Sequence, residues 1–214
     1  LIKKMTATET AGAISVICTD KTGTITENKM KVVEVCTSGF CSSFESSFSE
    51  ALYQNFICNS TAEIQFNGKK VVFNGNPTEC ALIEAYVKSS KNNDYCSYRK
   101  SFEVVDREPF SSDKKTMSTT IKYKDTKRTL IKGAPEKILN KCNLSREQIE
   151  YIREQITARQ KKAKRVLCFA HYDSEENVEK VEYVYDGFVA IEDPIRKEVF
   201  DAVQELLKAR RNEN

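Results

Sequence analysis

The stretch that decides the fold runs from residue 14 to residue 24 and reads ISVICTDKTGT. Its first five residues are a continuous apolar run, and polar residues follow at once. This pattern is typical of a buried parallel strand that ends in a loop. In α/β sheets, ligands bind in the crevice outside the carboxyl ends of such strands. We therefore expect a parallel strand at 14–18 and a ligand-binding loop that begins near Asp20.

The residues after this expected strand have the chemistry that a phosphoryl group requires. Thr22, Gly23 and Thr24 offer backbone N–H groups, hydroxyls and a flexible turn. Lys21 adds a positive charge. Asp20 supplies an oxygen nucleophile, which phosphoryl transfer needs together with donors for the equatorial oxygens. An ordinary Asp/Thr/Gly turn after a strand would contain the same residues, so this segment alone leaves both interpretations open.

Length and composition describe an ordinary globular chain. Of its 214 residues, 40% are hydrophobic and 30% are charged, which suits one large or two modest domains. The 34 basic and 31 acidic residues give a net charge of +3, and this balance indicates neither a nucleic acid nor an anionic membrane as partner. The sequence has no apolar run near the ~20 residues that span a bilayer, and its first residues do not resemble a signal peptide.

Eight cysteines are scattered without a CxxC pair or a neighbouring histidine cluster. Several lie inside apolar runs, where a free thiol behaves as a small hydrophobic group. We therefore expect a chain that folds without disulfides in a reducing compartment, and we expect no structural metal. His171 is the only histidine, which excludes mechanisms that need two.

The remaining sequence predicts an α/β fold with a mainly antiparallel sheet. Asn67-Gly68 predicts the turn of a hairpin over 63–73, and Asn76 before Pro77 predicts the start of a helix. Ser145 with Gln148 forms a capping-box pattern. We expect strands at 30–36, 102–106, 116–123, 128–132, 166–172 and 183–191, helices at about 48–58, 77–89, 145–163 and 193–209, and a surface loop at 88–98. The sheet should have six or seven strands, flanked by helices.

Five motifs, in order along the chain, resemble those of the P-type ATPases. They are CTDKTGTITENKM (18–30), GNPTECAL (75–82), EPFSSDKKTMS (108–118), KGAPE (132–136) and DPIRKEV (193–199). The first contains the family's phosphorylation pattern DKTGT-x-T-x-N. GNPTECAL is similar to a string in plasma-membrane members of the calcium-transporting branch, so the resemblance indicates a calcium pump.

The resemblance implies three segments. Residues 1–28 would begin a HAD-like parallel α/β phosphorylation domain, 29–192 would form an inserted nucleotide-binding domain, and 193–214 would start the second part of the phosphorylation domain. The family's later TGD and GDGxNDxP motifs and its membrane helices are missing. We therefore expect a soluble, monomeric fragment from the cytoplasmic side of a multi-pass membrane pump, with joining segments that act as hinges and a phosphorylation part that is incomplete.

The resemblance also implies roles in phosphoryl transfer. Asp20 would be the nucleophile that becomes an aspartyl phosphate, and Lys21 and Thr22 would help to hold the phosphoryl group. Asp20 and the Thr22 carbonyl would bind Mg²⁺, so the implied cofactors are ATP and Mg²⁺. Sister phosphatases have a second acidic residue two positions after the nucleophile, where this chain has Thr22.

For the nucleotide, the resemblance makes Phe110 the platform for adenine. Lys115 and Lys132 would lie near the ring and the phosphates, and Gly133 would let the base approach the backbone. From the residues alone, Phe110 could belong to the core and the lysines to a solvated strand face. Calcium pumps often have an arginine where this chain has Ser112, and Lys114 could replace its charge.

Five further residues complete the implied site. Glu79 would accept a hydrogen bond from the adenine amino group, with Thr78 beside it, although Glu79 also fits a capping box. Arg165 would contact the β-phosphate, although it could equally end a helix. Asp193 and Arg196 would form a hinge pair near the phosphates, and Asp193 could instead be an N-cap.

The sequence thus predicts an ATP-binding fragment of a P-type cation pump, with calcium as the transported ion, bound by membrane helices absent from this chain. We expect the fragment to bind ATP with a dissociation constant of roughly 0.1–1 mM but not to transport. The alternatives are a HAD-type phosphatase or phosphotransferase, a P-type pump for another cation, and a nucleotide-free interaction domain.

Overall fold

The computed structural model describes residues 16–37, 40–43, 48–67, 70–89, 95–174 and 181–211. Its contacts divide the chain into two units: residues 1–28 with 193–214 form unit 1, and residues 29–192 form unit 2. Among the described residues, every helix is too short or too polar to span a bilayer.

Unit 2 is built on a seven-stranded antiparallel sheet with the strand order β2-β1-β9-β8-β7-β6-β5. The strands are β1 (Lys31–Thr37), β2 (Phe40–Ser43), β5 (Val104–Glu108), β6 (Thr116–Tyr123), β7 (Thr126–Gly133), β8 (Arg165–Ser174) and β9 (Val184–Glu192). A separate hairpin contains β3 (Glu63–Asn67) and β4 (Lys70–Asn74). The predicted α/β class with a mainly antiparallel sheet is confirmed.

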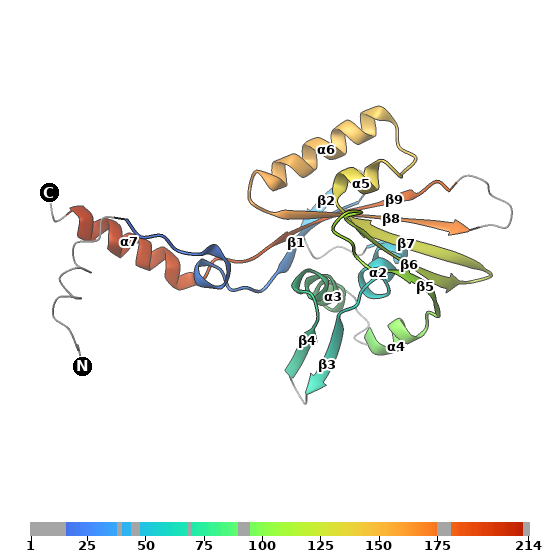
Figure 1. Cartoon of the computed structure of the whole chain (residues 1–214), viewed down its shortest axis with the longest axis horizontal. Helices are drawn as coiled ribbons and strands as arrows, with labels where there is room; N and C mark the ends of the chain where they lie inside the picture. Colours follow the sequence, from blue (N-terminus) through green and yellow to red (C-terminus); the bar gives the residue numbers. More distant parts are fainter. Residues whose placement is uncertain are drawn as a thin grey trace. The chain divides into compact units, whose positions relative to one another are not determined.

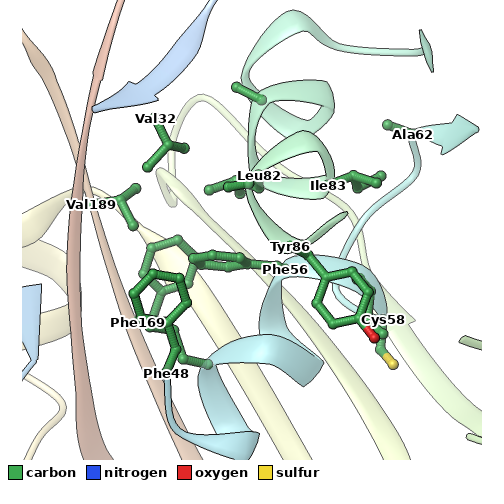
Figure 2. Packing of buried hydrophobic residues seen from close by; sticks show 14 of the residues in the cluster. Val32, Phe48, Phe56, Cys58, Ala62, Leu82, Ile83, Tyr86, Phe169 and Val189 are labelled. Carbon is green, nitrogen blue, oxygen red and sulfur yellow. The ribbon is translucent and has the colours of Figure 1, made fainter. Parts of the chain in front are cut away.

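Helices cover both faces of this sheet (Figure 1). On one side lie α2 (Glu50–Ile57), α3 (Pro77–Ser89) and α4 (Tyr95–Lys100), and on the other lie α5 (Pro135–Leu139) and α6 (Arg146–Gln160). The larger core is on the α2 side, where Phe56 and Phe169 meet edge to face with ring centroids 5.2 Å apart (Figure 2). A smaller core on the α6 side contains Ile138, Ile156 and Phe188.

Two buried asparagines join α2 to the middle of the sheet. Asn55 Nδ2 donates to the carbonyls of Ile131 (3.1 Å) and Ala170 (3.2 Å). Asn59 Nδ2 donates to Asn55 Oδ1 (3.0 Å) and to the Met117 carbonyl (3.1 Å). The two side chains therefore form hydrogen bonds to β6, β7 and β8. These bonds fix the position of α2 relative to the strands.

Most of the predicted elements of unit 2 are confirmed. The helix predicted at 77–89 is α3, and Asn76 Oδ1 caps it by accepting from the Thr78 N–H at 2.9 Å. Ser145 and Gln148 form the capping box at the start of α6. The hairpin predicted over 63–73 is β3–β4, although Gly68 of its turn lies outside the described residues.

Three short elements of unit 2 were not predicted: β2, α4 and α5. The loop predicted at 88–98 is wrong at its end, because α4 begins at Tyr95 and that side chain is 3% exposed. Residues 90–94 of that loop lie outside the described residues. Elements of four to six residues have too few positions for a periodic pattern, so neighbouring strands and helices decide them.

Unit 1 departs from the sequence prediction at both of its segments. No strand occurs at 16–18, where Val16 and Ile17 are 74% and 62% exposed. An apolar run becomes a strand only beside a second strand, and the described part of unit 1 contains none. The final helix α7 (Lys197–Arg211) begins later than predicted, because Ile195 first forms an antiparallel bridge with Thr26. The parallel sheet of a HAD-like domain stays a prediction.

The expectation that no cysteine forms a disulfide is wrong, since Cys36 is disulfide-bonded. Cys36 lies opposite Cys41 in the register of β1 and β2, and β2 is a strand that the sequence did not predict. The cysteines found free are Cys18, Cys58, Cys80, Cys96, Cys142 and Cys168.

Replacing Asn55 with leucine should lower the free energy of unfolding by about 2–4 kcal/mol, because it removes two buried hydrogen bonds and one partner of Asn59. Urea denaturation would measure the change. Asn143→Ala is the control, since Asn143 is exposed and bonds Glu182 at the surface; its effect should stay within about 0.5 kcal/mol. An Asn55→Leu variant as stable as the unaltered chain would contradict the proposed role of these asparagines.

Candidate functional site

Positively charged side chains hold residues 58–62, the segment that follows α2. The hydrogen bonds to its carbonyls run from Arg107 to Cys58, from Lys132 to Asn59, and from Arg99 to Ser60 and Ala62. Carbonyls at and beyond the end of a helix lack intrahelical donors, so they need such partners. Three cations thereby gather at the carboxyl end of α2.

Glu79 supplies the negative charge at this place, from the first turn of α3. Its Oε1 accepts from Lys132 Nζ at 2.7 Å, and both side chains are at least nine-tenths buried. Its Oε2 accepts from the Thr61 N–H (2.9 Å), the Thr61 hydroxyl (2.7 Å) and the Ala62 N–H (3.2 Å). The capping-box interpretation is therefore wrong, because the Glu79 carboxylate bonds these groups and Asn76 caps the helix alone. Only Oε1 keeps room for a further donor.

Burial and charge act in opposite directions on this ion pair. Burial alone would raise the pKa of Glu79, but the Lys132 charge and the hydrogen bonds from Lys132 and Thr61 lower it to about 2. Burial also lowers the pKa of Lys132, and Glu79 opposes that shift. The solvated-face interpretation of Lys132 is wrong, because this lysine is buried near the end of β7.

The loop between β5 and β6 carries Phe110 and Lys115. Phe110 is 61% exposed, so the interpretation as a core residue is wrong. Lys115 has a left-handed backbone (φ 55°), and its Nζ lies 3.9 Å from the Glu136 carboxylate. Lys114, the proposed replacement for an arginine, forms an ion pair with Glu108.

Gly133 ends β7 where the chain passes very close to it. A Cβ at this glycine would lie 2.4 Å from the Lys115 carbonyl oxygen and 2.8 Å from Thr116 Cγ2. The same carbonyl accepts from the Ala134 N–H at 3.0 Å. The contact between the ends of β6 and β7 is therefore one physical reason for a glycine here, and the approach of a base to Gly133 stays a prediction.

Arg165 lies beside the ion pair through its contact with α3. Its Nη1 donates to the Thr78 hydroxyl at 2.8 Å, and Thr78 directly precedes Glu79. The interpretation of Arg165 as a helix end is wrong, because α6 ends at Gln160 and Arg165 begins β8.

The strand directions bring these residues to one end of the sheet. In an antiparallel sheet, the ends of β5 and β7 lie beside the starts of β6 and β8. Phe110 follows β5 and Lys115 precedes β6, and the remaining residues end β7 or begin β8: Lys132, Gly133 and Arg165. Five of the predicted residues, together with Thr78 and Glu79 from α3, therefore belong to connected elements of unit 2.

The Asp20 loop forms a second group, in unit 1. Asp20, Lys21 and Thr22 are exposed at a short π-type turn, η1 (Lys21–Ile25). Gly23 has a φ of 80°, a left-handed value that favours glycine. The side chains predicted for phosphoryl transfer are thus presented on a turn with an unusual backbone.

Residues 193–196 hold this turn from the other segment of unit 1. Arg196 donates to the carbonyls of Gly23 (2.9 Å) and Thr26 (3.0 Å). The Asp193 carboxylate accepts from the Thr26 hydroxyl at 2.6 Å. The N-cap interpretation of Asp193 is wrong, because α7 begins four residues later. The pair is therefore a clamp on the Asp20 loop.

The sequence reasoning missed the residues that support the site in unit 2. They are Asn59, Thr61, Arg99 and Arg107. Asn55 lies in α2 and Asn59 follows the end of that helix, and their spacing by four residues is the signal that could have found Asn59. The two arginines carry no comparable signal, since each acts on a segment far away in the sequence.

Replacing Glu79 with glutamine should destabilise the chain by about 3–5 kcal/mol near neutral pH, because it leaves Lys132 buried without its counter-ion. The folded-state pKa of Glu79 is about 2, below the ordinary value of 4.5, so its contribution is present above about pH 5 and is lost as the pH falls toward 2. In urea denaturation, the difference between variant and unaltered chain should narrow across this window.

Glu103→Gln is the matched control for this charge change. Glu103 pairs with Lys122 at 3.8 Å, and both side chains are mostly exposed, so its effect should stay within about 1 kcal/mol at all pH values. A Glu79→Gln difference that stays constant down to pH 3 would exclude the ion pair as its source.

Comparison with known proteins identifies the chain's relatives. A family model described as the P-type ATPase cytoplasmic domain N matches residues 47–198. Calcium-transporting ATPase 1 of Bacillus cereus is 32% identical over 98% of this chain and 25% of its own length. Calcium-transporting ATPase lmo0841 of Listeria monocytogenes is 33% identical over 98% of this chain and 26% of its own length.

A plant relative shows the same partial coverage. Calcium-transporting ATPase 2, plasma membrane-type, of Arabidopsis thaliana is 32% identical over 95% of this chain and 23% of its own length. The chain thus spans about a quarter of the length of these relatives. Since the matched domain covers more than half of the chain and most of unit 2, the chain belongs to the P-type ATPase family.

Proposed function

We propose that the chain contains the ATP-binding site of a calcium pump and the aspartate that ATP phosphorylates. ATP would bind to unit 2 at the end of the sheet that carries Phe110, and Asp20 of unit 1 would accept the phosphoryl group. The choice of calcium comes from the names of the relatives. The transported ion would bind to membrane helices outside this chain, which would lie on the cytoplasmic side.

The observation that carries the ATP-binding proposal is an exposed aromatic ring on a loop that contacts the end of the strand carrying Lys132. Phe110 is on the same loop as Lys115, whose backbone contacts the end of β7 beside Lys132. An aromatic face can stack on a base, and lysine and arginine can pair with phosphates. Glu79 Oε1 retains the capacity to accept one more hydrogen bond, as an exocyclic amino group would require.

The phosphoryl transfer proposed for unit 1 is a displacement at phosphorus. A carboxylate oxygen of Asp20 forms a bond to the γ-phosphorus, the bond from that phosphorus to the β–γ bridging oxygen breaks, and ADP leaves. Lys21 and Thr22 are exposed next to Asp20 and would donate to the equatorial oxygens. Arg196 would keep the loop in place through its bonds to backbone carbonyls.

The donor atoms of this loop fit Mg²⁺. The Asp20 carboxylate and the Thr22 carbonyl would supply two of the hard oxygen donors that this ion prefers, and exposure of both residues leaves room for the waters that it retains. When bound, the ion would neutralise charge on the transferred phosphoryl group.

Titration of the chain with ATP should produce saturable NMR shift changes around Phe110 and Lys132, with a dissociation constant of roughly 0.1–1 mM. Phe110→Ala should raise this constant at least about fivefold, because stacking on an aromatic side chain contributes ~1–3 kcal/mol per base. Tyr151→Ala is the control, since Tyr151 is a similarly exposed aromatic residue on α6, across the sheet from α3.

Two results would refute this assignment. One is a chain without shift changes at several millimolar ATP, and the other is a Phe110→Ala variant with an unchanged titration curve. Release of phosphate from p-nitrophenyl phosphate, abolished by Asp20→Asn, would favour a phosphatase instead.

A further inference from the structure

The last turn before β8 determines where Arg165 lies. After α6 ends at Gln160, four residues lead directly to Arg165. Ala163 in this turn has a φ of 58°, a left-handed value that is unfavourable for a residue with a side chain. Backbone hydrogen bonds from Ala163 to the Gln160 carbonyl and from Lys164 to the Arg159 carbonyl close the turn. Such a strained backbone persists only where other contacts hold it.

Glu34 of β1 supplies those contacts. Its Oε2 accepts from Arg159 Nε at 3.0 Å, and its Oε1 accepts from Lys164 Nζ. Arg159 lies in the last turn of α6 and Lys164 directly precedes β8, so one carboxylate holds both ends of the turn. The hydrogen bond from Lys164, supported by Arg159, keeps the pKa of Glu34 below its ordinary value.

The register of the sheet places Glu34 and Arg165 on opposite faces. Glu34 pairs with Ala190, and Ala190 pairs with Val166, so these three side chains form one row on the α6 face. Arg165, one residue before Val166, therefore points to the opposite face, where its guanidinium reaches Thr78 on α3. Glu34 thus holds the turn before β8 from the α6 face of the sheet, while the Arg165 guanidinium lies on the α3 face.

We propose that Glu34 is a positioning residue for the polyphosphate end of the nucleotide: by holding the turn before β8, it fixes Arg165 where it can contact a phosphate. This inference rests on the proposed ATP-binding function and adds a residue to that site. Removing Glu34 would let the turn relax, and Arg165 would lose its fixed position. Glu34 itself touches no part of the nucleotide in this proposal.

Measuring the dissociation constants of ATP and of AMP for the whole chain distinguishes a role of Glu34 in phosphate contact from a general effect on stability. Arg165→Ala should weaken ATP binding and leave AMP binding unchanged, since AMP lacks the β-phosphate. Glu34→Gln should weaken ATP binding by about three- to tenfold and also leave AMP unchanged. The double variant should bind ATP no more weakly than Arg165→Ala alone, because both changes remove the same contact.

Two further variants serve as rescue and control. Ala163→Gly in the Glu34→Gln background should restore ATP binding, because glycine adopts the left-handed turn without outside support. Glu103→Gln makes the same charge change at an exposed position of unit 2 and should leave both nucleotides unaffected.

The possible failures are distinguishable. Glu34→Gln with unchanged or stronger ATP binding, or with ATP and AMP weakened equally, would overturn the role of Glu34 while the unaltered chain still binds ATP. An unaltered chain that does not bind ATP would refute the proposed function and this role with it. Amide exchange at Lys164 and Arg165, measured without nucleotide, should be faster in Glu34→Gln; unchanged exchange would overturn the claim that Glu34 holds the turn.

Discussion

Lys132 of β7 and Glu79 of α3 form a buried ion pair, and the candidate site of unit 2 is built around this pair. Burying two charges is costly, and the cost is offset only when every remaining hydrogen-bonding group finds a partner. Here the partners are the Asn59 carbonyl for Lys132 and the backbone and hydroxyl of Thr61 for Glu79. The pair therefore fixes the start of α3, the end of β7 and the segment after α2 at once. Without it, three elements that are distant in the sequence would lose their common anchor.

Alternating directions in the antiparallel sheet explain why the candidate nucleotide residues come from several motifs. A strand that finishes at this end of the sheet contributes the residues after it, and a strand that starts there contributes the residues before it. Phe110 and Arg165 reach the same end in these two ways, although 55 positions separate them in the numbering. Asn55 of α2 and Asn59 just after it are buried and hold the helix against the middle strands that these loops connect.

The sequence was informative where the deciding signal is local. Asn76 with Pro77 and Ser145 with Gln148 predicted two helix starts, and both are found. The apolar run at 14–18 was misleading, because a strand also requires a neighbouring strand. The resemblance to a known family supplied the candidate site residues, but not the contacts that hold them. The Glu79–Lys132 pair spans 53 positions and depends on the register of β6 and β7, which local patterns do not specify.

The position of β1 beside β9 has a consequence for unit 1. Lys31 and Glu192 are partners in the register, so the chain enters and leaves unit 2 on adjacent strands, which lie about 5 Å apart. Loop-closure entropy depends on how far a connecting segment can wander between its ends. Strand pairing already holds these two ends together. The entropy cost of connecting the two segments of unit 1 through unit 2 is therefore similar to that of a short loop. A large insertion can therefore interrupt the smaller unit with little loss of chain entropy.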